Sequence, residues 1–207
     1  MGNNSMSVPV QFYFDFISPY SYLAWNWVKN ENFKLKPVPV TLAQVIHSYE
    51  TKGPAEIAPK RDYLWKHCLR TAKRRGIPFV MPAKLPFNSS YALRLAIASD
   101  NDPKIIDLIF KLAWCEGKDI GDPDLLLKYP ELKSLDVLAS SKEMRRALKT
   151  NVAQAIENKV FGTPTFIVND ELFWGDDCKN DLLDFIAGND PLDREHFNIF
   201  LERFGRE

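Results

Sequence analysis

One short segment near the N-terminus constrains the fold more than any other part of this chain. An almost continuous apolar run, residues 11–17, is typical of a strand covered on both faces of a sheet, and Ser18 and Pro19 follow it directly. Ser18 therefore stands at the start of a helix, where unpaired backbone N–H groups hold anions. The helix is indicated by apolar residues at helical spacing: Tyr20, Leu23, Ala24, Trp27 and Val28.

A second segment, far downstream, has the form of a turn in which a proline enters a strand. It reads Phe161-Gly162-Thr163-Pro164-Thr165-Phe166 and continues as an apolar run. Asn169 and Asp170 then separate this run from another, residues 171–174, which is the pattern of a two-residue turn between paired strands. A run rich in valine and proline at 37–42 predicts an edge strand, so the chain supplies a small sheet.

Helix patterns fill the centre and the end of the chain. Asp176 or Asp177 caps a helix that runs to about Ala187, and a last helix is predicted from Pro191 to Phe204. The centre carries helical spacing or helix-start residues in four segments: 58–75, 88–99, 103–116 and 141–148.

These patterns predict an α/β protein with two parts. Residues 9–43 and 151–207 form the part that contains the sheet, residues 44–150 form an all-helical insertion, and residues 1–8 are a flexible N-terminus. A chain of 207 residues, 45% of them hydrophobic, is large enough to bury a core of its own.

The charge balance and the apolar runs exclude several partners. Lys and Arg together number 27, as do Asp and Glu, so no long-range field gathers nucleic acid or an anionic membrane. No apolar run approaches the ~20 residues of a membrane span, and residues 1–6 lack the basic flank of a secretory signal. We therefore expect a cytoplasmic protein that binds neither nucleic acid nor membrane.

The cysteines indicate neither a disulfide framework nor a metal site. Cys68, Cys115 and Cys178 are far apart and odd in number, so buried, inert thiols are the expectation. The three histidines share no spacing that would hold a metal, and we expect none.

Three motifs stand in order along the chain: Phe12-Tyr13-Phe14-Asp15-Phe16-Ile17-Ser18-Pro19-Tyr20-Ser21-Tyr22-Leu23-Ala24, Phe161-Gly162-Thr163-Pro164-Thr165-Phe166 and Leu172-Phe173-Trp174-Gly175. Together they closely resemble those of the 2-hydroxychromene-2-carboxylate isomerases, which belong with the kappa-class glutathione transferases in the DsbA-like branch of the thioredoxin superfamily. The likeness runs through nearly the whole chain from about residue 9. It implies a thioredoxin-like (DsbA-like) fold with a large all-helical insertion between its β-α-β half and its β-β-α half.

Ser18 is the catalytic residue that the resemblance implies. Thioredoxin-like oxidoreductases carry Cys-x-x-Cys in the first motif, whereas this chain has Ser18-Pro19-Tyr20-Ser21, so its thiol must come from elsewhere, and glutathione is the implied supplier. Ser18 then donates a hydrogen bond to the glutathione sulfur. A hydroxyl donor at a helix N-terminus favours the thiolate, which is the nucleophile. The alternative is that Ser18 only caps its helix.

The resemblance also assigns residues that bind glutathione. Pro164 is expected in the cis form, which leaves the backbone N–H and C=O of Thr163 to pair with glutathione. Asp177 matches the acidic residue that meets the γ-glutamyl ammonium. Lys60 matches a position that faces a glutathione carboxylate, and Asn88 matches a polar position that lines the site.

Asp176 belongs to the same glutathione-binding segment but departs from the family, in which a neutral polar residue is more common there. A second carboxylate at this place lowers the affinity for glutathione unless it points to solvent. The small aromatic substrate needs a pocket with apolar walls. Four aromatic residues are candidates for these walls, and the alternative for each is a place in the hydrophobic core: Tyr20, Trp65, Phe87 and Trp174.

The function implied by the resemblance is a glutathione-dependent cis-trans isomerase. It converts 2-hydroxychromene-2-carboxylate to trans-o-hydroxybenzylidenepyruvate, or acts on a related intermediate of aromatic catabolism such as naphthalene degradation, without net oxidation or reduction. Two alternatives stay open: a kappa-like glutathione transferase or peroxidase, and a non-catalytic thiol-binding protein. A homodimer is compatible with each of these functions.

Overall fold

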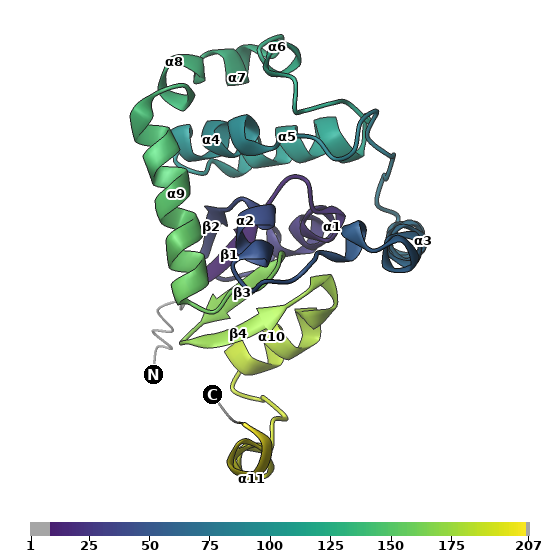
Figure 1. Cartoon of the computed structure of the whole chain (residues 1–207), viewed down its shortest axis with the longest axis vertical. Coiled ribbons are helices and arrows are strands. Elements are labelled where there is room, and N and C mark those ends of the chain that lie inside the picture. Colours follow the sequence, from purple (N-terminus) through teal and green to yellow (C-terminus); the bar gives the residue numbers. More distant parts are fainter. Residues whose placement is uncertain (1–8, 206–207) are drawn as a thin grey trace.

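The computed structural model describes residues 9–205, and its centre is a four-stranded mixed sheet (Figure 1). Strand β1 pairs with β2 in parallel and with β3 antiparallel, and β3 pairs with β4 antiparallel. The flexible N-terminus predicted for residues 1–8 lies outside the described range. In spatial order the strands are β2 (Leu35–Pro39), β1 (Val10–Phe14), β3 (Thr165–Val168) and β4 (Glu171–Trp174).

Helices cover both faces of this sheet. Phe12 and Phe14 on one face of β1 join a core with α1 (Pro19–Val28) and α10 (Lys179–Ile186), which Leu182 anchors. On the opposite face, Tyr13 packs with side chains of α2 (Leu42–His47) and α9 (Lys142–Glu157). This two-sided burial explains why β1 reads as a continuous apolar run rather than an alternating one.

The insertion lies against the sheet domain through aromatic side chains. Phe110 of the insertion packs on Phe14 and Phe16, with ring centroids 5.7 and 4.7 Å apart. One hydrophobic core therefore runs through both parts of the chain. The remaining helices of this region are η1 (Pro54–Glu56), α3 (Ala58–Arg75), α4 (Ser90–Ala98), α5 (Pro103–Trp114), α6 (Pro123–Leu126), α7 (Pro130–Lys133) and α8 (Asp136–Ala139).

The predicted fold class is confirmed, and the differences concern the ends of elements and several short helices that were not predicted. The domain boundary placed at residue 150 falls inside α9, a single helix that continues to Glu157 because Val152 and Ala155 pack under the sheet. The first strand ends at Phe14, three residues earlier than predicted.

The C-terminal half of the sheet domain follows the predicted order. Asn169 and Asp170 adopt positive φ angles of 48° and 64°, so the predicted two-residue hairpin turn is confirmed. The 3-10 turn η2 (Asp176–Cys178) precedes α10, and α11 (Arg194–Phe204) ends the described chain. No helix among residues 9–205 is long and apolar enough to cross a lipid bilayer.

Candidate active site

Ser18 occupies the junction between β1 and α1. It is the N-cap of α1, with extended backbone angles (φ −84°, ψ 113°), and its Oγ accepts a hydrogen bond of 3.1 Å from the backbone N–H of Ser21. Pro19 follows as the first helical residue, where a missing N–H costs no helical hydrogen bond. The predicted position of Ser18 at a helix N-terminus is therefore confirmed, although its side chain is buried, 3% exposed.

The cis-proline turn lies directly against Ser18. The Thr163–Pro164 peptide bond is cis, as predicted. The Ser18 hydroxyl donates a hydrogen bond of 3.1 Å to the carbonyl oxygen of Thr163, which is 145 residues away in the sequence. The two distant motifs thus form one site, and the only proton of the Ser18 hydroxyl is already shared with a backbone carbonyl.

Two buried hydroxyl groups at this junction have no hydrogen-bond partner. They are the Oγ of Ser21, at the position of the second cysteine in Cys-x-x-Cys proteins, and the Oγ1 of Thr163. Within residues 9–205 the one other buried side-chain atom of this kind is Oδ1 of Asn101. Buried polar groups are normally paired, so the concentration of unpaired hydroxyls beside Ser18 is a property expected of a polar ligand site.

The Asp176-Asp177 segment lies next to the proline turn through Gly175. The N–H of Gly175 donates a hydrogen bond of 3.0 Å to the carbonyl of Pro164. Gly175 has a φ of +100°, and a Cβ there would lie 2.4 Å from Oδ1 of Asp177, so the Asp177 side chain folds back over the glycine. Asp177 is exposed, and its carboxylate can meet a ligand from solvent.

The prediction that Asp176 or Asp177 caps the following helix is wrong. Cys178 is the N-cap of α10, and no side chain caps this helix end. The 3-10 turn that precedes α10 begins after Gly175 and moves both carboxylates away from the capping position.

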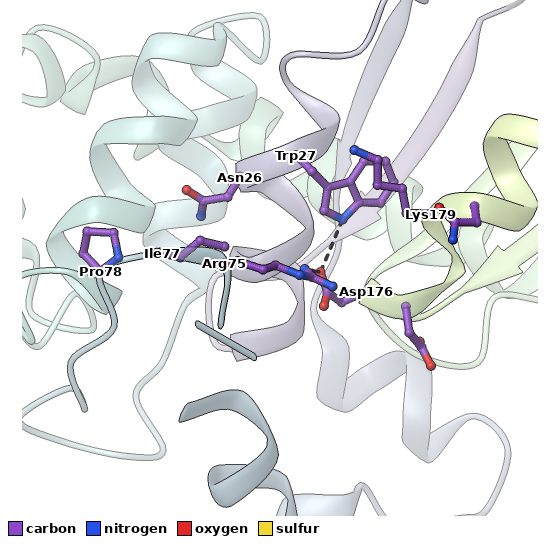
Figure 2. A pocket seen from close by; sticks show the side chains of 10 residues that line it. Asn26, Trp27, Arg75, Ile77, Pro78, Asp176 and Lys179 are labelled. Carbon is purple, nitrogen blue, oxygen red and sulfur yellow. Dashed lines mark hydrogen bonds and ion pairs between the residues drawn. The ribbon is translucent and has the colours of Figure 1, made fainter. Parts of the chain in front are cut away.

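Asp176 turns inward, to Trp27 and Arg75 (Figure 2). Its Oδ1 accepts hydrogen bonds of 3.3 Å from Nε1 of Trp27 and 2.8 Å from the Arg75 guanidinium. Burial raises the pKa of the Asp176 carboxyl above its ordinary value, and the Arg75 guanidinium opposes that rise. Asp176 is only 4% exposed, so its carboxylate does not point to solvent. The orientation that would keep a second negative charge away from bound glutathione is therefore not observed. Arg75 supplies the compensating charge instead.

A pocket of about 530 Å³ adjoins this ion pair (Figure 2). It contains Asp177 but none of Ser18, Thr163 and Pro164, so it lies to one side of the Ser18 junction. Its walls come from the end of α1, the end of α3 and the start of α10: Asn26, Trp27, Arg75, Gly76, Ile77, Pro78, Asp176, Asp177, Lys179 and Asn180.

Helix α3 adds aromatic and thiol groups beside α1. The ring of His67 lies 5.9 Å from those of Tyr20 and Tyr63, and the Tyr20 hydroxyl lies beside the Cys68 thiol. Burial raises the pKa of the Tyr20 phenol, so this hydroxyl keeps its proton at neutral pH. Tyr20 lies in the first turn of α1, two residues after Ser18, and its role as a substrate wall stays a prediction.

The other aromatic candidates differ from one another in exposure. Phe87 is buried in the core, and the half-buried Trp65 packs on Trp114 at 6.1 Å, so core packing explains both. Trp174 is 55% exposed and packs on the exposed Phe161, with ring centroids 5.2 Å apart. Phe161 comes just before the proline turn in the sequence, and Trp174 pairs with Thr165, the residue just after Pro164.

Within residues 9–205, no hydrogen bond or ion pair joins Lys60 or Asn88 to the Ser18 junction. Lys60 is exposed in the first turn of α3, one helical turn before Tyr63. Asn88 is exposed in the loop before α4, where its Oδ1 accepts a hydrogen bond from the N–H of Ser90. Both side chains are free to reach a ligand, and their roles stay predictions.

Two of the protein's three cysteines are unsuited to act as the nucleophile. All three are free. Burial raises the pKa of Cys68 to about 12 and that of Cys178 to about 12, so both remain thiols at neutral pH.

Two residues that support the site were missed in the sequence. Asp15 is 1% exposed, and its carboxylate accepts hydrogen bonds from the N–H groups of Ile17, at 3.1 Å, and Leu42, at 2.8 Å. Trp114 of α5 donates a hydrogen bond of 2.8 Å to the carbonyl of Phe16. Both hold the loop that leads into Ser18, and the signal for Asp15 was a lone carboxylate in an apolar run.

A thioredoxin fold with serine at the start of its first helix and a cis-proline turn beside it defines the class of this protein. The DsbA-like thioredoxin domain is the family model that matches the chain, over residues 9–187. The chain therefore belongs to the DsbA-like thioredoxin family, within the group of the 2-hydroxychromene-2-carboxylate isomerases, to which the following comparisons connect it.

Three relatives illustrate the likeness. The 2-hydroxychromene-2-carboxylate isomerase of Pseudomonas putida is 31% identical over 192 residues, which cover 81% of this chain and 89% of the relative. Glutathione S-transferase kappa 2 of Caenorhabditis elegans is 28% identical, over 86% of this chain and 91% of the relative. A solved 2-hydroxychromene-2-carboxylate isomerase structure superposes with a TM-score of 0.75 at 27% identity, over 92% of this chain and 98% of the other.

Proposed function

We propose that this protein is a glutathione-dependent isomerase that converts 2-hydroxychromene-2-carboxylate to trans-o-hydroxybenzylidenepyruvate or acts on a related intermediate of aromatic catabolism. The observation that carries the proposal is Ser18, a hydroxyl donor at a helix N-terminus where thioredoxin-fold oxidoreductases keep a cysteine. The relatives named as isomerases support the reaction class. A cytoplasmic location fits, because that compartment maintains reduced glutathione.

The residues at the junction fit glutathione. Its thiol would lie at Ser18, its cysteinyl backbone at Thr163, and its γ-glutamyl ammonium at the exposed carboxylate of Asp177. The unpaired Oγ1 of Thr163 offers a further polar contact at this place. Lys60 and Asn88 are proposed to approach from the insertion, and Asp176 acts on the ligand through its ion pair with Arg75 rather than by direct contact.

Glutathione, when bound, supplies the nucleophilic thiolate, which Cys68 and Cys178 do not provide because burial raises their pKa values. Ser18 and the N-terminus of α1 both favour negative charge at that position. If together they lower the pKa of a thiol by about two units, they stabilise the thiolate by about 2.7 kcal/mol. We expect the rate to rise with pH until this thiol ionises, below the pH at which free glutathione does.

The aromatic substrate is proposed to lie against Phe161, Trp174 and Tyr20. The first two are exposed and adjoin the proline turn, and a Cβ at Gly162 would lie 2.8 Å from Nε1 of Trp174, so the ring packs closely on the turn. Apolar faces here would orient a flat substrate and exclude water from the reacting bond.

A kappa-like glutathione transferase is the second candidate, and the kappa-class relative from Caenorhabditis elegans favours it. The two functions differ in what happens to glutathione. An isomerase leaves it unchanged, whereas a transferase incorporates it into the product and a peroxidase oxidises it.

The deciding experiment is incubation of the protein with glutathione and a set of chromene carboxylates and electrophiles, with products separated by chromatography and weighed by mass spectrometry. An isomer of unchanged mass, with glutathione saturating but not consumed, supports the isomerase. A product heavier by glutathione, or oxidised glutathione, supports the second candidate. Full turnover without any thiol contradicts both.

A matched pair of variants controls this experiment. Ser18→Ala removes the proposed donor together with an N-cap, whereas Ser141→Ala removes only the N-cap of α9, where Ser141 Oγ accepts from the N–H of Met144 at 3.2 Å. Turnover should be lost in the first variant and kept in the second. Equal turnover in the two would reduce Ser18 to a capping residue.

A further inference from the structure

A second cavity, of about 450 Å³, lies on the face of the sheet that packs against α9. Gln11 and Tyr13 of β1 line it, together with their register partners on β2, Lys36 and Val38. Alternate residues of a strand share one face of a sheet, so these side chains form a continuous floor. None of the residues assigned to the Ser18 junction lines this cavity, which is therefore a separate feature of the fold.

The opposite wall of the cavity is a polar stripe along α9. Asn151, Gln154 and Asn158 follow one another at i, i+3 and i+7, which places them on one side of this helix. Val152 and Ala155, on the neighbouring stripe, are buried and hold α9 against the sheet. The side of a helix that lies against a sheet usually carries apolar residues, so core packing does not explain these carboxamides.

Hydrogen bonds orient the carboxamides that line the cavity. Nδ2 of Asn158 donates to the Tyr13 hydroxyl at 2.9 Å, and that hydroxyl donates to Oε1 of Gln11 at 2.6 Å. Nδ2 of Asn151 donates to the carbonyl of Pro39 at 3.0 Å. These bonds leave the Oδ1 atoms of Asn151 and Asn158 as acceptors for a ligand, and Nε2 of Gln11 as a donor.

Asn101, in the turn between α4 and α5, adds an unpaired acceptor to this lining. Its Oδ1 is buried and accepts no hydrogen bond from any group of residues 9–205. Asp100 and Asn101 have φ angles of 56° and 57°, so a left-handed turn presents the side chain. Leaving a buried acceptor unpaired is costly, so a ligand hydroxyl that reaches this oxygen gains more than one that only replaces water.

We propose that this cavity, the amide pocket, binds a neutral polyhydroxylated ligand of monosaccharide size. A hydroxyl group both donates and accepts hydrogen bonds, and so does a carboxamide, so the two are complementary. The volume lies within the range of small-molecule sites, about 300–1,000 Å³. The carboxamides that define the pocket are Gln11, Asn101, Asn151, Gln154 and Asn158.

The remaining lining residues argue against an ion or a nucleobase. The charged side chains of the lining, Lys36 and Glu157, have opposite signs, so they do not select an ion of either sign. A nucleobase binds by stacking on an exposed aromatic face. Tyr13 is the aromatic residue of the lining, and it is only 2% exposed.

The test is titration of the full chain with glucose, N-acetylglucosamine, ribose and myo-inositol, followed by two-dimensional NMR of the backbone amides. We expect at least one of these probes to cause saturable shifts centred on residues 11, 36, 101 and 151–158. The affinity should be the same at low and high salt, because a neutral ligand bound through carboxamides involves no screened charge.

A matched pair of variants shows whether the carboxamide of Asn101 binds the ligand. Asn101→Gly removes it without backbone strain, because glycine adopts positive φ readily, and should weaken binding by about tenfold, the effect of one lost hydrogen bond. Its Tm should not fall, since an unpaired buried acceptor is removed. Asn169→Gly makes the same change at an exposed residue with φ of 48°, outside the pocket, and should bind like wild type. Gln154→Leu keeps the length and helix propensity of the side chain and should also weaken binding.

Three results would overturn the proposal. The first is the absence of saturable binding for all of these probes. The second is binding of equal affinity in the Asn101→Gly, Gln154→Leu and Asn169→Gly variants. The third is an affinity that falls as salt rises, which would indicate that charge and not the carboxamides holds the ligand.

Discussion

The ion pair between Arg75 and Asp176 provides the most direct test of how this site tolerates a buried carboxylate. We consider Arg75→Met, which keeps the length and the helix propensity of the side chain but removes its charge. Asp176, 4% exposed, would then keep only the indole N–H of Trp27, at 3.3 Å, as a side-chain donor. The variant therefore isolates the free energy of an uncompensated carboxylate.

The expected size follows from the burial of the two partners. Breaking a fully buried pair costs about 3–5 kcal/mol, whereas exposed pairs contribute about 0–1 kcal/mol. The Asp176 side chain is 4% exposed but that of Arg75 is 38% exposed, which places this pair between the two limits. We expect the free energy of unfolding to fall by about 2 kcal/mol at neutral pH, a loss of roughly 5 °C in Tm for a chain of this size.

The loss should depend on pH in one direction. Burial holds the pKa of folded Asp176 above the 3.8 of the unfolded chain, Arg75 opposes this, and the neighbouring carboxylate of Asp177 adds to it. Without Arg75 the folded pKa rises further. The destabilisation is therefore complete above that pKa and diminishes as the pH falls through it, because the folded carboxyl then takes up a proton.

Urea unfolding followed by circular dichroism, repeated between neutral and mildly acidic pH, measures both effects. Arg74→Met is the control, since Arg74 is the neighbouring charge, 3.3 Å from Oγ1 of Thr71 rather than bonded to Asp176. Adding Asp176→Asn to Arg75→Met should recover most of the lost stability. Equal losses in the Arg74 and Arg75 variants, or a loss that grows on acidification, would refute the reasoning.

Three further predictions concern the site. Ser18→Ala should lower glutathione-dependent turnover by about a hundredfold. It should also lower the free energy of unfolding by about 1–3 kcal/mol, because a helix cap and a buried hydrogen bond are lost. Near-normal turnover in steady-state assays would contradict the first expectation. Asp177→Asn should raise the KM for glutathione more than it lowers kcat, as lost uniform binding does, and an unchanged KM removes Asp177 from the ligand set. Trp114→Phe leaves the Phe16 carbonyl unpaired and should lower the free energy of unfolding by about 1–3 kcal/mol in denaturant titrations, with reduced turnover. A Trp114→Phe variant as stable and active as wild type would show that the loop before Ser18 keeps its conformation without this hydrogen bond.

Local chemistry explains which elements could be predicted from the sequence. Helix α3 has the predicted bounds, because Gly76 takes a left-handed conformation with φ of 64° and ends it. The hairpin at Asn169 and Asp170 was equally predictable, since these residue types tolerate positive φ. Helices α6 to α8 were not predicted, because four residues each are too few to show a helical period.

Long-range contacts explain what could not be predicted. The helix predicted over 141–148 continues to Glu157, because packing of Val152 and Ala155 under the sheet extends it. In the site, Ser18 and Pro164 carry local signatures of a cap and a turn. The bond between Arg75 and Asp176 joins positions 101 residues apart, and no spacing in the sequence indicates it.

Because of the hydrogen bond from Ser18 to the Thr163 carbonyl, the site should bind a charged sulfur in preference to a neutral one. A serine hydroxyl has one proton, and here a neutral oxygen at 3.1 Å already accepts it. A neutral thiol is a weak acceptor and cannot displace that carbonyl, whereas hydrogen bonds to an anion are roughly twice as strong as neutral ones. The Ser18 hydroxyl would therefore exchange the Thr163 carbonyl for a sulfur only when that sulfur has lost its proton. The hydrogen bond present without ligand thus favours the thiolate, which is the nucleophilic form, over the thiol.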